Sequence, residues 1–188
     1  ETIVVQGRVE VRGEHRFARL VVLPGAVLTH AATAGETIER LDLEVTGDVY
    51  VSPSATIDAI GLGFEGGLQR SNPNPEGRTA PGLQEAQAGL GGSHAGEGEP
   101  AEDGWGAETY GSCRAPDLPG GGGGASLSGD PGGAGGGVIK LHVGGRLIID
   151  GAIDASGISG EGGAAGAGGS VQLEATSIGG TGWVRAMG

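Results

Sequence analysis

The chain has 188 residues, of which 37% are hydrophobic but only 3% aromatic, so it has too few large side chains for a thick globular core. Its net charge of −12, with only 11 Lys and Arg in total, argues against nucleic-acid binding, which needs clustered basic residues. No apolar run approaches the about 18 to 20 residues of a membrane helix, and a single cysteine, Cys113, excludes an internal disulfide.

The first 61 residues carry short runs in which apolar and polar positions alternate. Residues 3–11 alternate around Gly7, and residues 17–29 hold two apolar runs that flank the turn dipeptide Pro24-Gly25. Residues 41–61, LDLEVTGDVYVSPSATIDAIG, repeat the alternation. Alternation over short runs, interrupted by glycine, predicts short β-strands with one buried face.

The same pattern returns in residues 138–157, VIKLHVGGRLIIDGAIDASG, with predicted turns at Gly144-Gly145 and Asp150-Gly151. Residues 57–59 align with residues 153–155, and a third copy follows in residues 171–188. A repeat of about twenty residues that contains only strands and turns favours a solenoid. We therefore predict an all-β fold, a right-handed parallel β-helix of four to five coils.

Residues 62–137 interrupt this pattern with a Gly-, Pro- and acid-rich excursion, so that glycine reaches 44 residues in the whole chain. Glycine runs can adopt extended, polyproline-II-like conformations and pack through backbone hydrogen bonds. We expect these insertions to form a polyglycine-II-like layer beside the β-helix, with disordered loops as the alternative. We predict a single domain, residues 1–188, with N-terminal coils in residues 1–61 and C-terminal coils in residues 138–188.

The excursion and the later coils also carry a family resemblance. The run GGSHAGEG at residues 91–98 precedes TYGS at 109–112, then a glycine run, then GGAGGGVIKLHVGGRLIIDGAIDASG and GGSVQLEA. This order, over residues 57–188, resembles the glycine-rich repeat modules of large secreted or surface proteins in bacteria, protists and plants. The resemblance implies a parallel β-helix outside the cell and no established activity. The acidic insert at residues 97–108 departs from it.

That insert supplies the candidate metal ligands. Calcium takes about six to eight oxygen ligands, and glycine-rich loops expose carbonyl oxygens. The chain lacks the calcium-roll nonapeptide and the EF-hand loop, so a solvated acidic loop is the alternative. Calcium is thus the possible cofactor, and no other is expected. Its candidate ligands lie within seven residues: Glu97, Glu99, Glu102 and Asp103.

Catalytic groups are not predicted. Asp58 and Asp154 align in the repeat and could form the carboxylate pair of a glycoside hydrolase, but Arg185 aligns with them and both acids occupy turns. His94 lies near Cys113, but no acid that could orient a Cys-His pair is identifiable. We assign structural roles instead. They fall on His94, hydrogen-bonded to glycine backbone together with Tyr110, and on the repeat glycines Gly145, Gly151 and Gly157.

The predicted function is that of a non-catalytic extracellular scaffold or adhesion module. Solenoid ends expose unpaired strand edges, and no helix or polar cap is recognisable at either end, so we expect self-association into a fibre or surface layer. The alternative is a carbohydrate-binding or carbohydrate-cleaving protein, with Trp105 and Tyr110 as stacking residues and a cell-surface polysaccharide as partner. We expect any specific binding site to lie in residues 62–137.

Overall fold

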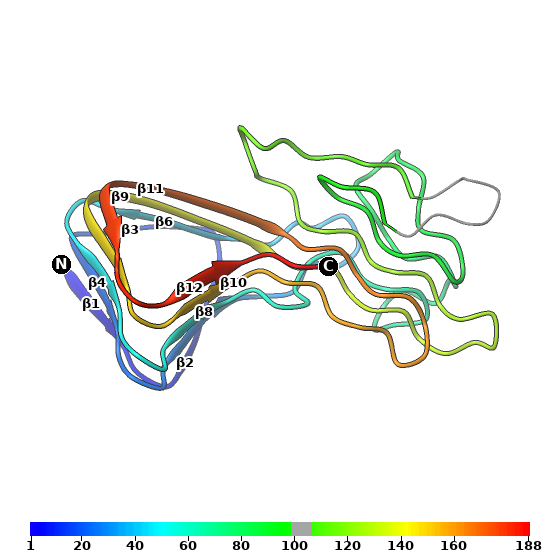
Figure 1. Cartoon of the computed structure of the whole chain (residues 1–188), viewed down its shortest axis with the longest axis horizontal. Coiled ribbons are helices and arrows are strands. Elements are labelled where there is room, and N and C mark those ends of the chain that lie inside the picture. Colours follow the sequence, from blue (N-terminus) through cyan, green and yellow to red (C-terminus); the bar gives the residue numbers. More distant parts are fainter. Residues whose placement is uncertain (99–106) are drawn as a thin grey trace.

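The computed structural model describes residues 1–98 and 107–188, and these contain strands but no helix. None of this described part can therefore cross a membrane as a helix. The strands occupy one end of the molecule and the glycine-rich segments the other (Figure 1). They are β1 (Thr2–Val5), β2 (Arg8–Val11), β3 (Glu14–Phe17), β4 (Arg19–Val22), β5 (Val27–His30), β6 (Leu41–Val45), β7 (Val49–Val51), β8 (Thr56–Asp58), β9 (Val138–Ile149), β10 (Ala152–Asp154), β11 (Ser170–Gly179) and β12 (Trp183–Arg185).

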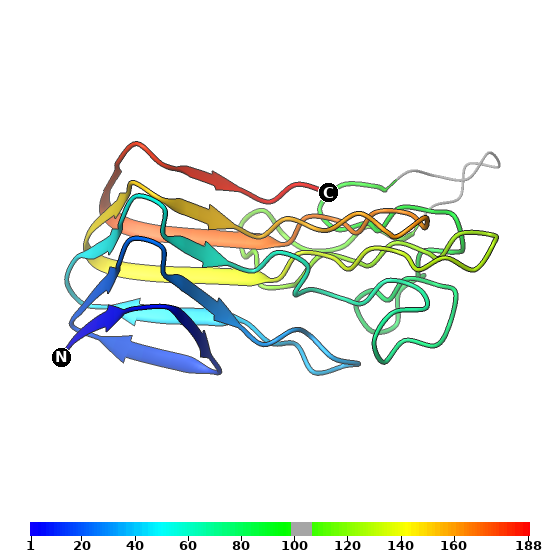
Figure 2. The same cartoon turned by 90° about the horizontal axis from the view of Figure 1, so that it is seen from below.

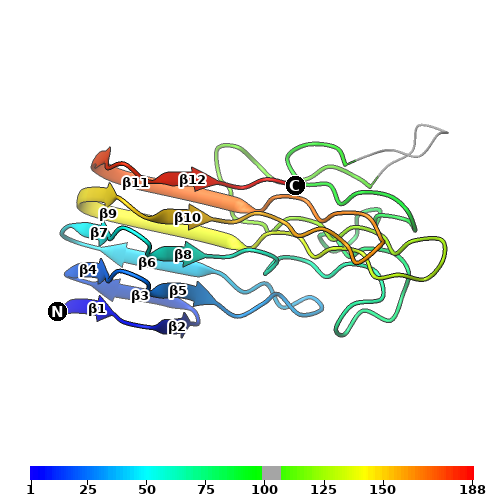
Figure 3. The ribbon, with the colours of Figure 1, turned by 60° about the horizontal axis from the view of Figure 1, so that its bottom comes forward.

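We call residues 1–61, 138–157 and 170–188 the strand body. It contains two sheets in which every strand pair is parallel. The seven-stranded sheet has the order β1-β4-β7-β9-β6-β3, with β11 also paired to β9, and the five-stranded sheet has the order β12-β10-β8-β5-β2. The chain passes around the core repeatedly, so strands far apart in sequence lie side by side (Figure 3).

The predicted right-handed parallel β-helix of four to five coils is wrong as a fold class. Gly144-Gly145, expected to end one strand and begin another, lies inside the 12-residue strand β9. The first half of β9 pairs with β6 and the second half with β7. Strand β9 thereby joins the pair β3-β6 and the series β1-β4-β7 into one sheet. The parallel sheets then close around a common core as a near-barrel, instead of stacking as separate coils.

The core of the strand body is a column of aliphatic side chains. Leu43 on β6 lies beside Leu141 on β9, and Ile57 on β8 lies beside Ile153 on β10; all four are fully buried. Their neighbours in sequence, such as Glu44, point outward, because successive side chains of a strand face opposite sides. The alternation read from the sequence therefore corresponds to inward and outward positions.

We call residues 62–98, 107–137 and 158–169 the glycine body (Figure 2). Its runs lie side by side and are joined by backbone hydrogen bonds. We call residues 120–125 the central run. Its backbone N–H groups that donate to the same neighbouring run recur every third residue, which is the repeat of a polyproline II helix of about three residues per turn. Residues 120 and 123 donate to the run 133–136, residues 121 and 124 to the run 90–93, and residues 122 and 125 to the run 75–78.

Close packing of these runs requires residues without a side chain. A Cβ atom at Gly122 would overlap the carbonyl of Glu65, and one at Gly135 would overlap the carbonyl of Gly120. In both cases the obstacle is backbone, which cannot rotate away as a long side chain can. The composition of the runs is therefore a steric requirement of the glycine body.

Candidate functional site

The first candidate site is the aligned carboxylate pair of the strand body. Asp58 and Asp154 are neighbours on β8 and β10, and Arg185 on β12 follows in the same column, as the repeat alignment predicts. Arg185 Nε donates to Asp154 Oδ2 at 2.8 Å, and Ser156 Oγ donates to Asp154 Oδ1 at 2.6 Å. Asp154 was predicted to be a surface turn residue but is fully buried, so Arg185 and Ser156 compensate its buried charge.

Asp58 has its own partners. Its Oδ1 accepts the backbone N–H of Ile60 at 3.0 Å, and its Oδ2 lies 3.6 Å from Arg8 Nη1. Both carboxylates thus serve turns and ion pairs. The arrangement offers no proton donor placed beside a free carboxylate, which glycoside cleavage requires.

A second candidate is the polar cluster around His94 in the glycine body. The ring of His94 is 7% exposed, and its Nδ1 donates to the carbonyl of Gly168 at 3.0 Å. Its Nε2 has no hydrogen-bond partner among the described residues. Burial lowers the pKa of His94, so the ring is neutral near pH 7. This placement agrees with a structural role in which His94 fixes the run of residues 162–169.

Tyr110 packs against the same cluster. Its ring centroid lies 5.1 Å from that of His94 and 6.3 Å from that of Phe64. Its hydroxyl donates to the carbonyl of Pro119 at 2.7 Å, and burial raises its pKa. The Tyr110 ring is therefore held inside the glycine body. Cys113, the other residue named with His94, has an exposed thiol. Trp105, the other predicted stacking residue, lies outside the described residues.

The predicted calcium ligands are only partly described. Glu97 lies at the rim of the glycine body, whereas Glu99, Glu102 and Asp103 lie outside the described residues. Within residues 1–98 and 107–188, no three His, Cys, Asp or Glu side chains gather in a way that could hold a metal ion.

The predicted structural glycines all occupy crowded positions. A Cβ atom at Gly145 would overlap the side chain of Asp48, one at Gly151 the carbonyl of Ala55, and one at Gly157 the carbonyl of Gly166. The first two lie in the strand body and the third lies where the chain enters the glycine body. A side chain at any of them would push adjacent passes of the chain apart.

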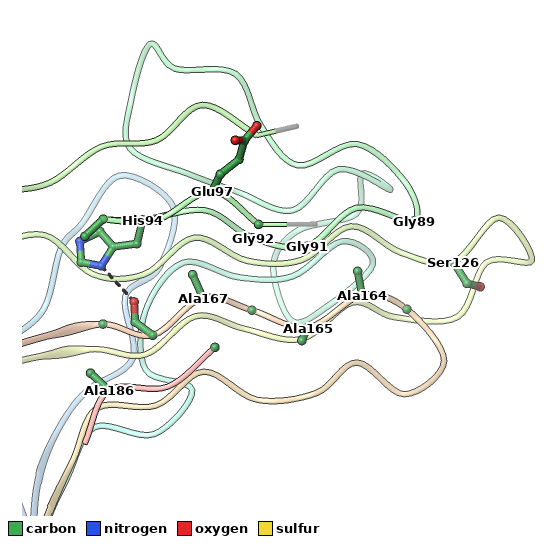
Figure 4. Close-up of a pocket in the computed structure, with 18 of the residues that line it drawn as sticks. Gly89, Gly91, Gly92, His94, Glu97, Ser126, Ala164, Ala165, Ala167 and Ala186 are labelled. Carbon is green, nitrogen blue, oxygen red and sulfur yellow. Dashed lines mark hydrogen bonds between the residues drawn. The ribbon is translucent and has the colours of Figure 1, made fainter. Parts of the chain in front are cut away.

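A cavity of about 920 Å³ lies between the run of residues 89–98 and the run of residues 162–169. Its walls are mainly glycine and alanine (Figure 4). His94 is turned toward Gly168, and the carboxylate of Glu97 points away from residues 164–167 in this view. Among the described residues, the lining therefore offers mainly backbone and methyl groups, with His94, Glu97 and Ser126 as its polar side chains.

The remaining candidate is the end of the strand body formed by β11 and β12. Ile178 and Val184 point inward, as do their fully buried neighbours Leu147 and Ile153, but they are 54% and 44% exposed. Trp183 is also exposed, with the guanidinium of Arg185 4.2 Å from its ring centroid. The sequence analysis expected any specific binding site in residues 62–137 and did not single out these side chains. The signal that could have found them was the last copy of the repeat, residues 171–188, which no further copy follows in residues 1–188.

The opposite end of the strand body is formed by β1, β2 and β3. Each pairs with a single strand, β4, β5 and β6 respectively, and so leaves one edge unpaired within the described residues. Val4 is exposed on β1, and Arg8 and Glu10 are exposed on β2. Both ends therefore present unpaired backbone groups beside apolar core positions.

A comparison of the chain with protein-family models finds no match, and comparisons with curated proteins and with solved structures find none either.

Proposed function

We propose that this protein is a non-catalytic extracellular structural module that associates end to end into a fibre or surface layer. The observation that carries the proposal is the open end at β11 and β12. Ile178 and Val184 continue the core column, and no strand among residues 1–98 and 107–188 covers them. Exposed apolar groups beside an unpaired strand edge favour the addition of another chain.

The environment of the buried acids supports a structural role over catalysis. Glu65 is buried and accepts hydrogen bonds from the hydroxyl and N–H of Ser71, with Arg78 Nε 3.8 Å away. Asp154 is likewise paired with Arg185 and Ser156. Catalytic carboxylates need access to substrate, and these two are occupied by the protein itself.

The extracellular location in this proposal is what the resemblance of residues 57–188 to glycine-rich repeat modules implies. A net charge of −12 keeps a protein soluble when much of its backbone is glycine and carries no side chain to hold water. The single thiol, Cys113, needs no partner for the fold, since all described contacts of the core come from other residues. Both features suit a soluble module whose fold needs no disulfide.

The test is the mass of the protein in solution as a function of concentration, by light scattering, with electron microscopy of the same samples. We expect the mass to rise with concentration and elongated particles to appear. Val184→Lys places a charge in the open core end and should hold the protein as monomers. Leu127→Lys, at a site that is 91% exposed in the glycine body, is the control and should behave like the parent. Monomers of the parent at every concentration would refute the proposal.

A further inference from the structure

The alignment of side chains along the sheets indicates how two copies would join. This inference rests on the proposed end-to-end association. We infer that the copies join head to tail, with β1, β2 and β3 of one copy pairing with β11 and β12 of the next. β1 and β2 lie at one end of the strand body and β11 and β12 at the other (Figure 3). The partner is therefore a second copy of this chain in the same orientation.

The inward-facing columns support this pairing. The first runs through successive strands and ends on apolar residues at both ends of the body: Ile3, Leu20, Val49, Leu147 and Ile178. The second does the same: Val9, Leu28, Ile57, Ile153 and Val184. Extending each register by one strand places Ile178 against Ile3 and Val184 against Val9 of the next copy. The half-exposed ends of the core would then cover one another.

The outward-facing columns add complementary chemistry. One column begins with an acid and ends with a base: Glu10, Thr29, Asp58, Asp154 and Arg185. The neighbouring column begins with a base and ends with an aromatic ring: Arg8, Val27, Thr56, Ala152 and Trp183. Across the junction, Arg185 would face Glu10 as an ion pair, and Trp183 would face Arg8 as a cation–π pair.

This junction uses different surfaces on the two copies. Such a contact is heterologous, and it leaves a free end on each side of every dimer. The same parallel register that builds the sheets inside one chain is thereby continued between chains. The assembly grows as a polar filament and has no symmetric dimer as its end point.

Disulfide cross-linking tests the register directly. Thr2 begins the column beside Ile3, and Ser177 ends it beside Ile178, so Thr2→Cys and Ser177→Cys in a Cys113→Ser background would lie on adjoining strands. Adjoining strands are about 4.8 Å apart, within the about 4.4 to 6.8 Å that a disulfide spans. We expect a ladder of covalent oligomers on a non-reducing gel. Gly179→Cys in place of Ser177→Cys shifts the pair by two residues and should give no ladder.

Charge reversal provides the second measurement. Glu10→Arg would place two guanidinium groups at the junction and should weaken association by about tenfold, as like charges do at an interface. Glu85→Arg makes the same change in net charge in the glycine body, away from the junction, and should leave association unchanged. Both side chains are exposed, so both variants should fold.

The outcomes separate this inference from the proposed function. Association of the parent without a Thr2–Ser177 ladder, and with equal effects of Glu10→Arg and Glu85→Arg, would overturn the register and leave the scaffold proposal standing. A parent protein that stays monomeric would overturn both.

Discussion

The strand body and the glycine body order their chains by opposite means. In the strand body, side chains such as Leu43 and Leu141 fill a common core, and each strand alternates between buried and exposed positions. In the glycine body, the chains meet backbone to backbone, because the central residues have no side chain. Apolar burial is the main favourable contribution in the first region. In the second, hydrogen bonds and close contact must offset the large conformational entropy that glycine loses.

The difference predicts where a small added group is most damaging. Gly122→Ala adds one methyl group that would overlap the carbonyl of Glu65. Backbone from neighbouring runs surrounds the site, so relief requires the runs to separate. We expect a loss of about 4 kcal/mol or more in the free energy of unfolding, above the usual range for overpacking. Denaturant unfolding measures the loss, and hydrogen exchange of residues 120–125 reports whether it is confined to the glycine body.

The matched control for this variant is Gly96→Ala. Gly96 lies in the same body, but a Cβ atom there meets nothing within 4 Å, and its φ is not in the left-handed region. This variant should unfold like the parent. Equal stability of Gly122→Ala and Gly96→Ala would contradict close backbone packing of the runs.

A smaller loss is expected when a side chain is removed from the strand body. Leu141→Ala empties a fully buried position on β9 and should cost about 3 kcal/mol, the middle of the range for buried leucines. Leu127→Ala removes the same atoms from a side chain that is 91% exposed and should have little effect. The comparison of unfolding midpoints checks both. A cost for Leu141→Ala larger than that for Gly122→Ala would reverse the order of sensitivity between the two bodies.

The smallest expected effect is a dependence of stability on pH. Burial lowers the pKa of His94 in the folded protein below its ordinary value of 6.5. The unfolded chain therefore binds more protons in the window below pH 6.5, and folding stability falls as the pH falls through that window. His94→Gln should flatten this dependence, measured as thermal midpoints between pH 5 and pH 8.

Leu127→Gln is the control for the pH series, because Leu127 lies in the same glycine body, is 91% exposed and does not titrate. It should leave the dependence unchanged. His30 contributes in the same direction as His94, since burial also lowers its pKa. A pH profile of His94→Gln identical to that of the parent would show that His94 is accessible to protons in the folded state.

The strand positions could be predicted from sequence because alternation is a local property and the copies of the repeat align with one another. The alignment of residues 57–59 with residues 153–155 is the observed pairing of β8 with β10. The fold class could not be predicted. Gly144-Gly145 indicated a turn, but both glycines lie within β9, which continues through them and pairs first with β6 and then with β7. Glycine permits both outcomes, and only the tertiary contacts decide between them.

The candidate sites were less predictable than the strands. Tyr110 looked available as a stacking residue, but its ring lies against Phe64, a contact that no local pattern reveals. Asp154 looked like a surface turn residue and is fully buried with Arg185. The exposure of Ile178 and Val184 depends on the absence of a strand beyond them in the described part of the chain, which residue type alone does not encode.

The long offset between paired strands also governs how the molecule folds. Asp48, directly before β7, contacts Arg146 on β9, which lies 98 positions further along the chain. The segment between them includes most of the glycine body, whose residues are the most flexible of all before folding. Strand β9 can join the sheet only after this long loop closes, and contacts of such high sequence separation slow folding markedly. Until β9 is in place, β6 and β7 each lack one neighbouring strand, and we expect pairing of these edges with another chain to compete with correct folding.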